Sequence, residues 1–182
     1  MTDLNYCPRC AHALEDQMKF GRMRRVCPSC GFIFFRDPKV AAAVLAERDG
    51  QVVLVKRAVD PRKGDWALPA GFVEIDETPL EAAERECLEE CGLVAKVTEV
   101  LGVFHGNDNP ANPVILIVYW AKITGGELKA DDDVDEARLF KPIEIPTNLA
   151  FESTHVALAK WQMILSHRRK IARGRKSIGE SE

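Results

Sequence analysis

The sequence lacks the features that direct a chain into or across a membrane. Its first residues, MTDLNYCPRC, contain no basic stretch followed by an apolar one, so no secretory signal peptide is expected. No apolar run approaches the roughly 18 residues of a membrane-spanning helix. With 46% hydrophobic and 29% charged residues, the composition is typical of a globular protein. We therefore expect a cytoplasmic protein with no membrane partner.

Neither sign of charge dominates, because the formal net charge is only −3. The charges are nevertheless segregated along the chain. Residues 1–36 carry six Lys and Arg against three Asp and Glu (+3), and residues 160–182 carry seven against two (+5). The middle, residues 37–159, carries 12 against 23 (−11). Such an acidic middle suits cation binding, so an anionic substrate is expected to arrive with its cations.

Four of the six cysteines lie near the start of the chain, in the pairs Cys7-Pro-Arg-Cys10 and Cys27-Pro-Ser-Cys30. The pairs are separated by 16 residues, which is typical of a four-cysteine zinc site. In a cytoplasmic protein such thiols are expected to bind metal, with a redox dithiol as the alternative. A segment of about 35 residues cannot bury enough surface to fold alone, so Zn²⁺ is expected to be structural. Four thiolates leave no open position for catalysis.

Three arginines in this cysteine segment leave a nucleic-acid contact open as an alternative role: Arg22, Arg24 and Arg25. The segment shows neither a long basic run nor interleaved aromatic residues. Support of an enzyme domain, or of its dimer, is the simpler interpretation. Nucleic acid is therefore not expected as a partner.

The stretch from Thr78 to Gly92 predicts a helix with both ends marked. Thr78 suits the N-cap, Pro79 suits the first helical position, and Glu81 completes a T-x-x-E capping box. Gly92 is expected to end the helix. One helical face forms an apolar stripe that is expected to pack on the core: Leu80, Ala83, Cys87 and Cys91.

Three glutamates of this helix, Glu86, Glu89 and Glu90, fall within an arc of roughly 100°. Like charges at these spacings repel one another, so the cluster indicates a bound cation. Hard divalent ions such as Mg²⁺ take carboxylates together with waters and substrate phosphates. A solvated acidic helix face is the alternative. Arg85 lies beside the cluster, and Glu77, just before the N-cap, is positioned to hold that arginine.

The spacing of these residues resembles the Nudix box. Gly71, five residues, Glu77, seven residues and then the run from Arg85 to Leu93 match its pattern without a gap. Cys87 is the one unusual residue, a small thiol where a bulkier aliphatic side chain is usual. The preceding WALPAG also looks like the W-x-L-P-G-G segment of Nudix proteins, with Ala70 replacing the first glycine.

The resemblance covers about residues 37–165 and implies an α/β fold, a Nudix α/β/α sandwich, here preceded by a small four-cysteine zinc ribbon. The expected limits are residues 1–36 for the ribbon, 37–173 for the hydrolase domain and 174–182 for a disordered tail. Apolar runs predict strands at 40–46 and 51–57, joined around Asp49-Gly50, and at 97–104, 114–121 and 137–141. A turn is expected at 124–127 and a helix from 152 to about 173. The acidic run 131–136 suits a solvated loop or supplies a further carboxylate.

Proteins of this family hydrolyse a nucleoside diphosphate linked to another group, with Mg²⁺ or Mn²⁺ as the cofactor. Carried onto this chain, the resemblance makes Glu86, Glu89 and Glu90 the metal ligands, with a backbone oxygen near Gly71 added. Arg85 and Glu77 would hold the loop against the helix. The general base is left open between a box glutamate, Glu86 or Glu90, and a carboxylate from a later loop. Glu152 is the candidate for the latter, although it also suits a helix cap.

The resemblance also bears on the substrate. The SQPWPFPxS motif of NADH pyrophosphatases is absent after Leu93, whereas Pro110 lies near, but not on, the position of a proline that marks ADP-ribose pyrophosphatases. ADP-ribose or FAD, with release of AMP, is therefore expected. NADH, an RNA cap or a nucleoside triphosphate remains as an alternative substrate, and a nucleotide sensor or a nucleic-acid-binding regulator as an alternative function. Many family members are homodimers, so a homodimer is expected.

Several further residues are candidates for substrate contact. His105 follows a predicted strand and could touch the substrate, although a structural role in the core or a loop is the favoured interpretation. Three aromatic residues are available to stack on an adenine or flavin ring, and all three also suit a core: Phe35, Trp66 and Phe104.

Overall fold

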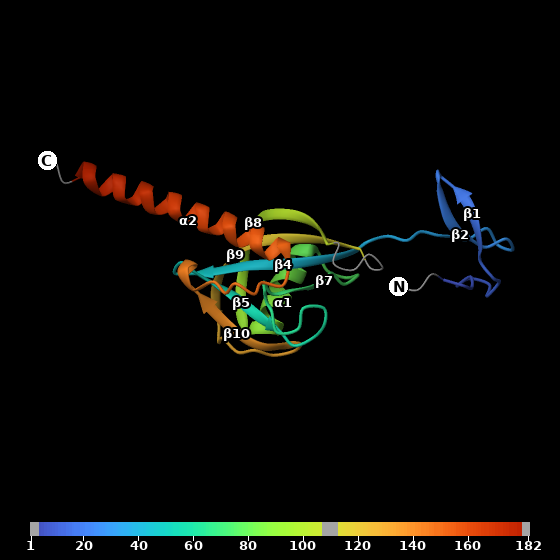
Figure 1. The fold of residues 1–182 in the computed structure, drawn as a ribbon, viewed down its shortest axis with the longest axis horizontal. Helices are drawn as coiled ribbons and strands as arrows, with labels where there is room; N and C mark the ends of the chain where they lie inside the picture. The colour runs from blue at the N-terminus through green and yellow to red at the C-terminus, as the bar shows by residue number, and fades with distance from the viewer. Residues whose placement is uncertain (1–3, 107–112, 180–182) are drawn as a thin grey trace. The chain divides into compact units, whose positions relative to one another are not determined.

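The computed structural model of the protein describes residues 4–106 and 113–179, with side chains in the last helix as far as Arg168. The chain divides into two compact units. Of the described residues, 4–39 and 113–114 belong to the first unit, and 40–106 and 115–179 belong to the second. Figure 1 labels both α-helices and most of the strands of the two units. The domain limits expected from the sequence stay predictions.

The first unit contains a three-stranded antiparallel sheet in the order β1-β2-β3. Its strands are β1 (Glu15–Lys19), β2 (Arg22–Val26) and β3 (Ile33–Phe34). Each C-x-x-C pair closes a turn, because the N–H of Ala11 donates to the carbonyl of Cys7 at 2.8 Å and the N–H of Gly31 donates to that of Cys27 at 3.0 Å. The apolar core is very small: Cys7, Leu14 and Cys27, with Phe32 packed against them. So small a core agrees with the expectation that a metal is needed for stability.

The second unit is built on a seven-stranded sheet. Five long strands follow the order β10-β5-β4-β9-β8, while β6 pairs with β5 and β7 pairs with β4. The strands are β4 (Lys39–Arg48), β5 (Gln51–Arg57), β6 (Trp66–Ala67), β7 (Ala70–Phe72), β8 (Leu93–Gly106), β9 (Val114–Gly126) and β10 (Val134–Phe140).

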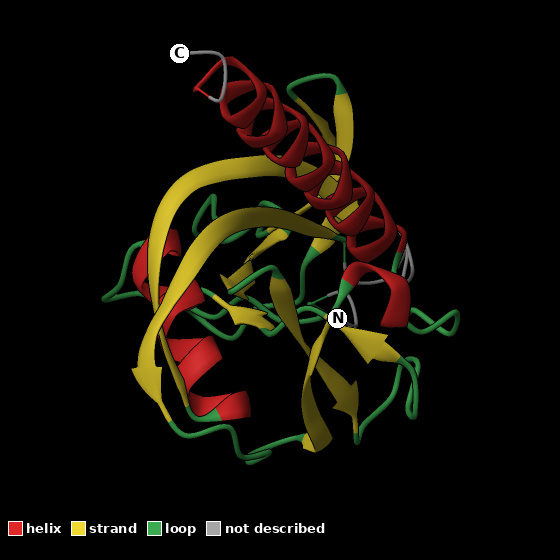
Figure 2. Cartoon of the chain, turned by 90° about the vertical axis from the view of Figure 1, so that its left-hand side faces the viewer, coloured by secondary structure: helices red, strands yellow, loops and turns green. Residues whose placement is uncertain are grey.

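Helices α1 (Pro79–Cys91) and α2 (Glu152–Gly179) cover opposite faces of this sheet (Figure 2). Alternation along the central strands explains this arrangement, because successive side chains of a strand point to opposite faces. On β4, Val44 packs in the cluster that contains Cys87 of α1, and Leu45 packs in the cluster that contains Trp161 of α2. The α/β/α sandwich expected from the sequence is confirmed. A short 3₁₀ helix, Pro142–Glu144, lies between β10 and α2.

The predicted hairpin is present between β4 and β5. Arg48 pairs with Gln51, and the two turn residues between them, Asp49 and Gly50, have φ values of 55° and 73°. Two positive φ angles define the tight turn that matches the twist of an antiparallel pair. The Asp49-Gly50 dipeptide was therefore sufficient to predict this hairpin from the sequence.

Four element boundaries differ from the prediction. Strand β8 begins directly after the helix, at Leu93, because Leu93 and Ala95 are buried on the core face and extend the pairing region. Strand β9 continues through Gly126, so the turn expected at 124–127 is wrong for most of its length. Strand β10 begins at Val134, inside the acidic run. Helix α2 extends to Gly179, beyond its expected end, and no helix in the described part of the chain is long and apolar enough to span a membrane.

Helix α1 has the predicted caps. The Thr78 hydroxyl accepts from the N–H of Glu81 at 3.3 Å, and the Thr78 N–H donates to the Glu81 carboxylate at 2.8 Å. Gly92 ends the helix at φ 68°, and its N–H donates to the carbonyl of Leu88 at 2.9 Å. The expected apolar stripe needs one correction, because Leu80 is 36% exposed in the first turn. The buried face consists of Ala82, Ala83, Glu86, Cys87, Glu90 and Cys91.

Gly92 yields a stability prediction. Its backbone is left-handed, and a Cβ there would overlap the carbonyl oxygen of Glu127, which is backbone and cannot turn away. Gly64 is a matched control, because it is also left-handed, at φ 85°, with nothing near its hypothetical Cβ. We expect Gly64→Ala to cost about 1–2 kcal/mol in the free energy of unfolding. Gly92→Ala should cost about 1–3 kcal/mol more because of the overlap. Urea denaturation checks this, and equal losses would contradict the packing described here.

Candidate active site

Strand β7 and helix α1 approach each other closely at Gly71. A Cβ on Gly71 would overlap the carboxylate of Glu86, so any larger residue there would displace that carboxylate from its position. The N–H of the neighbouring Ala70 donates to the Glu90 carboxylate at 3.2 Å. Two of the three predicted glutamates therefore lie against the backbone of β7, at Ala70 and Gly71. The expectation that an oxygen near Gly71 joins them as a metal ligand stays a prediction.

Arg85 connects the loop to the helix. Its Nε and Nη2 donate to the two carboxylate oxygens of Glu77, at 3.0 and 2.7 Å, which is the bidentate geometry of a strong ion pair. Nη2 also donates to the carbonyl of Phe72 at 3.1 Å. Nη1 donates to Glu86 at 2.6 Å and to Glu89 at 2.7 Å. The contact between Arg85 and Glu77 anticipated from the sequence is present, and the same guanidinium also orients two glutamates of the cluster.

Glu86, Glu89 and Glu90 differ in exposure. Glu86 and Glu90 are buried, at 8% and 5% exposure, whereas the Glu89 side chain is 46% exposed. The carboxylate oxygens of the three glutamates are not gathered around one point. Among the described residues, only the sulfur atoms of the four cysteines are grouped closely enough to hold one metal ion. The Arg85 guanidinium lies between Glu86 and Glu89 instead. The helix therefore presents two buried carboxylates and one accessible one.

Burial and like charge act together on the two buried glutamates. Burial raises the pKa of Glu90 to about 9, and the negative charges of Glu86 and Asp133 add to this effect. Burial also raises the pKa of Glu86, which its hydrogen bond and ion pair with Arg85 partly offset. The nearby charges of Glu89 and Asp132 raise it further. A cation bound beside these two glutamates would lower their pKa values again and stabilise their ionised forms.

The acidic run between β9 and β10 approaches the same glutamates. Asp132 and Asp133 lie near enough for their charges to act on Glu86 and Glu90. Asp131, by contrast, forms an exposed ion pair with Lys129 at 3.1 Å. The run is therefore more than a solvated loop, because it adds negative charge to the site.

The donor set fits a divalent cation. Within the described part of the chain, no Lys or Arg lies within salt-bridge distance of Glu90, whose hydrogen-bond donor is a backbone N–H. A buried carboxylate without a counter-ion is costly, and oxygen ligands with excess negative charge are what Mg²⁺ and Mn²⁺ require. A surface pocket of about 330 Å³ opens beside Glu89. Leu88, Glu127 and Lys129 are among its lining residues.

Glu152, the candidate general base, is the exposed first residue of α2. Two contacts hold this end of α2 beside β6: the N–H of Ala150 donates to the carbonyl of Trp66 at 2.8 Å, and Leu149 forms a β-bridge with Trp66. Trp66 starts the segment that leads to Gly71. The structure shows no direct contact between Glu152 and the described glutamates of α1, so its role stays a prediction.

The other candidates for substrate contact separate into core and surface residues. Trp66 packs edge-on against Phe140, with ring centroids 4.9 Å apart, and is a core residue. Phe104 is partly buried against the same cluster, and His105 is exposed on β8. Phe35 belongs to the first unit and is 44% exposed. Pro110, the marker considered for the substrate, lies outside the described residues.

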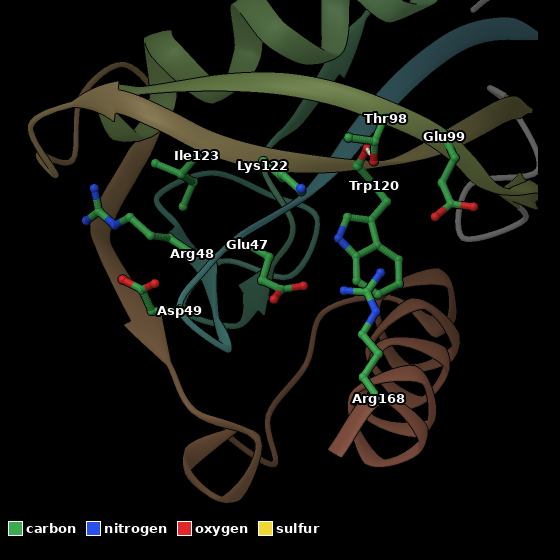
Figure 3. A pocket seen from close by; sticks show the side chains of 9 residues that line it. All are labelled: Glu47, Arg48, Asp49, Thr98, Glu99, Trp120, Lys122, Ile123 and Arg168. Carbon is green, nitrogen blue, oxygen red and sulfur yellow. Dashed lines mark hydrogen bonds between the residues drawn. The ribbon is translucent and has the colours of Figure 1, made fainter. Parts of the chain in front are cut away.

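A second surface pocket, of about 440 Å³, lies between the β4–β5 hairpin, β8, β9 and α2 (Figure 3). Arg168 stacks over the ring of Trp120 at 5.1 Å, and the indole N–H of Trp161 donates to Glu47 at 3.2 Å. Three acidic and three basic side chains line this pocket: Glu47, Asp49, Glu99, Arg48, Lys122 and Arg168. The charges balance, and no residue of α1 takes part, so the pocket is separate from the glutamate site.

The four cysteines of the first unit come together as the sequence predicted. The sulfurs of Cys7 and Cys30 lie 3.6 Å apart, those of Cys10 and Cys27 lie 3.5 Å apart, and all four lie within 4.8 Å of one another. Tetrahedral zinc with Zn–S bonds of about 2.3 Å requires S···S distances of about 3.8 Å. The set therefore fits a closed structural zinc site and brings both C-x-x-C pairs into one cluster.

Comparison with known proteins identifies relatives of both the sequence and the fold. Residues 36–162 match the NUDIX domain model. An ADP-ribose pyrophosphatase from Methanocaldococcus jannaschii is 47% identical over 119 residues, covering 65% of this chain and 70% of that protein. An NAD-capped RNA hydrolase from Chromobacterium violaceum is 29% identical over 142 residues, covering 78% of this chain and 51% of that protein. The crystal structure of a NUDIX hydrolase from Nitrosomonas europaea has a TM-score of 0.82 and 30% identity, covering 90% of this chain and 93% of that chain.

The α/β/α sandwich, with the glutamates of α1 packed against β7, and these relatives together identify the class of protein. It is a hydrolase that acts on phosphoanhydrides. The chain belongs to the NUDIX family. The family and the enzyme class expected from the Gly71–Leu93 pattern are confirmed.

The ion pair of Arg85 predicts a pH-dependent stability. Hydrogen bonds from Arg85 and from the N–H of Glu74 lower the pKa of Glu77 to about 2. A depressed folded-state pKa stabilises the fold above the unfolded value of about 4.3, and this contribution is lost as the pH falls toward 2. We predict that Glu77→Gln unfolds at lower urea concentration than the unsubstituted protein at pH 7 and that the difference shrinks below pH 4.3. Glu74→Gln, at an exposed carboxylate on the same loop, is the control. A difference that stays constant with pH would contradict the assignment.

The cysteine cluster predicts the metal content. We expect one zinc per chain by elemental analysis, and none in the Cys10→Ser/Cys30→Ser variant. Cys87→Ala, at a buried cysteine outside the cluster, should keep its zinc. Because the first unit has almost no apolar core, zinc removal should expose residues 4–39 to proteolysis while the second unit stays folded. Zinc retained by the double variant would show that these thiols are not the ligands.

Proposed function

We propose that the protein is a divalent-cation-dependent pyrophosphatase that cleaves the diphosphate of ADP-ribose or FAD and releases AMP. The observation that carries the proposal is the pair of buried glutamates, Glu86 and Glu90, held against the backbone of Ala70 and Gly71, where burial and neighbouring acidic groups raise the pKa of both. The relative that is 47% identical is an ADP-ribose pyrophosphatase, which supports the choice of substrate.

Each residue of the site has a role in this proposal. Glu86, Glu89 and Glu90 hold Mg²⁺ or Mn²⁺, with a backbone oxygen near Gly71 as a further ligand. The ion, when bound, neutralises phosphate oxygens and lowers the pKa of water. Arg85 and Glu77 act as positioning residues, because the guanidinium fixes the Phe72 carbonyl, Glu86 and Glu89 at once.

The reaction consumes one water molecule. The water oxygen forms a bond to one phosphorus of the diphosphate, and the bond from that phosphorus to the bridging oxygen breaks. With ADP-ribose the products are AMP and ribose 5-phosphate, and with FAD they are AMP and FMN. The water proton passes to a carboxylate. Glu152 is accessible and is our candidate, and Glu86 and Glu90 are the alternatives within the cluster.

A second candidate substrate is the cap of an NAD-capped RNA. The observation in its favour is the similarity to the NAD-capped RNA hydrolase. That similarity extends over 142 residues, or 78% of this chain, and is therefore longer than the match to the NUDIX domain model at residues 36–162. Both candidate substrates contain the same type of diphosphate, so the chemistry of the site is unchanged.

Hydrolysis of a substrate panel tests the proposal. The readout is AMP from ADP-ribose, FAD or NADH, the nucleoside monophosphate from 8-oxo-dGTP, and a 5′-monophosphate end on capped RNA. The protein is incubated with Mg²⁺ or Mn²⁺ and ADP-ribose, FAD, NADH, 8-oxo-dGTP or capped RNA, beside Glu89→Gln/Glu90→Gln. Glu84→Gln is the matched control, because Glu84 lies on the same helix and accepts instead from the N–H of Val97 at 2.9 Å. We expect turnover of ADP-ribose or FAD, with kcat/KM reduced at least about 100-fold in the double variant and unchanged in the control.

Two results would overturn parts of the proposal. Turnover restricted to capped RNA or triphosphates would refute the substrate and retain the site. Activity that survives in Glu89→Gln/Glu90→Gln, or is absent with every substrate, would refute the catalytic assignment of the helix.

A further inference from the structure

The hairpin of the first unit carries an exposed aromatic side chain at a strained position. Phe20 and Gly21 form the two-residue turn between β1 and β2, and Phe20 has a φ of 52°. Turns of this type favour Asn, Asp or Gly, because a left-handed backbone strains other residues. Phe20 is nevertheless 77% exposed and fills no core. A bulky residue kept in strain at the surface indicates a binding role.

Phe20 is part of a stacked aromatic group. Its ring lies parallel to that of Phe35, at an interplanar angle of 22° and a centroid distance of 6.3 Å. The guanidinium of Arg24 lies over the same Phe35 ring, 4.6 Å from its centroid. Both phenylalanines remain exposed, so this group offers flat surfaces to a partner.

The strand register gathers cations beside these rings. Lys19 pairs with Arg22, and Gln17 pairs with Arg24, so Lys19, Arg22 and Arg24 lie on one face of the hairpin. Among the residues that the structure describes, none of the three has a carboxylate within salt-bridge distance.

The opposite face of the hairpin differs. Arg25 lies there, and its charge is paired with that of Asp16 at 3.5 Å, in addition to a hydrogen bond to the carbonyl of Leu4 at 3.1 Å. Among the described residues, Arg24 by contrast donates only to a backbone carbonyl, that of Lys19, at 3.3 Å. The paired Met18 and Met23 lie on the same face as Arg25. Phe34, the partner of Arg25 in the sheet, also lies on that face, but it is only partly exposed. The two exposed rings, Phe20 and Phe35, are therefore grouped with the cations that lack a carboxylate partner.

We infer that the face formed by Lys19, Phe20, Arg22, Arg24 and Phe35 binds single-stranded nucleic acid. Unpaired bases stack on exposed aromatic rings, and the phosphates contact neighbouring cations. A duplex hides the faces of its bases, so RNA or DNA without secondary structure is the fitting partner. The inference concerns binding by the first unit and does not depend on the proposed hydrolysis.

Fluorescence anisotropy with labelled oligouridylate and oligothymidylate of about 12 nucleotides tests the inference, beside a duplex of the same length. The oligonucleotides carry a 5′-hydroxyl group, so the assay needs no hydrolysis and stays informative if the proposed function fails. We expect the zinc-loaded full chain to prefer the single strands. Three phosphate contacts predict a slope of log affinity against log salt of about −2. Tighter binding of one oligonucleotide than the other would distinguish RNA from DNA as the natural partner.

Variants on the two faces of the hairpin test which face binds the oligonucleotide. Phe20→Asn should weaken binding about tenfold, since one stacked base is lost, while the turn, the zinc content and the unfolding temperature are kept because Asn suits this backbone. Arg22→Gln/Arg24→Gln should reduce the magnitude of the salt slope by about 1.4. Met18→Ala and Arg25→Gln, on the opposite face of the same hairpin, should leave the affinity unchanged.

Three results would overturn the inference. The first is an absence of binding to either single strand, and the second is an equal loss of affinity in the variants of both faces. The third is a loss of self-association on sedimentation in Phe20→Asn without any effect on oligonucleotides, which would assign the face to a second copy of the chain.

Discussion

The site depends on one guanidinium. Arg85 donates to Glu77, to the Phe72 carbonyl and to two glutamates of its own helix, so it fixes the loop and the carboxylates in one network. Without it, the charges of Glu86 and Glu89 would repel each other, and the loop would lose its attachment to α1. The network leaves Glu90 outside, buried on a backbone N–H. A divalent ion would complete the charge balance that Arg85 provides for the other two carboxylates.

Signals that act within a few residues were read correctly from the sequence. Thr78, Pro79 and Gly92 define both ends of α1, and Asp49-Gly50 defines the hairpin, because cap and turn geometry depends on adjacent backbone. Burial was harder to predict. Leu80 looks like a core residue on a helical wheel, yet Glu86 and Glu90 are buried instead, because the Gly71 loop covers their part of the helix.

Contacts between distant segments were not predictable in detail. The charges of Asp132 and Asp133 act on the α1 glutamates only after the sheet has placed β10, and an isolated acidic run gives no sign of this. Likewise, Phe20 and Phe35 are far apart in the sequence, so their stacking beside Arg24 appears only in the fold. The strand register places Arg22 and Arg24 on one face of the hairpin and Arg25 on the other, whereas the sequence analysis treated the three arginines as one group. Separate units carry these two surfaces, so binding and hydrolysis are open to independent tests.

The central claim is that the buried carboxylates of α1 form a divalent-cation site. Anomalous diffraction from crystals grown with Mn²⁺ tests it most directly, since it locates the ion without relying on turnover. The account predicts an ion within about 2.5 Å of carboxylate oxygens of Glu86 and Glu90, with Arg85 still bound to Glu77. Manganese found only elsewhere on the molecule, with both glutamates still buried and unbound, would contradict it.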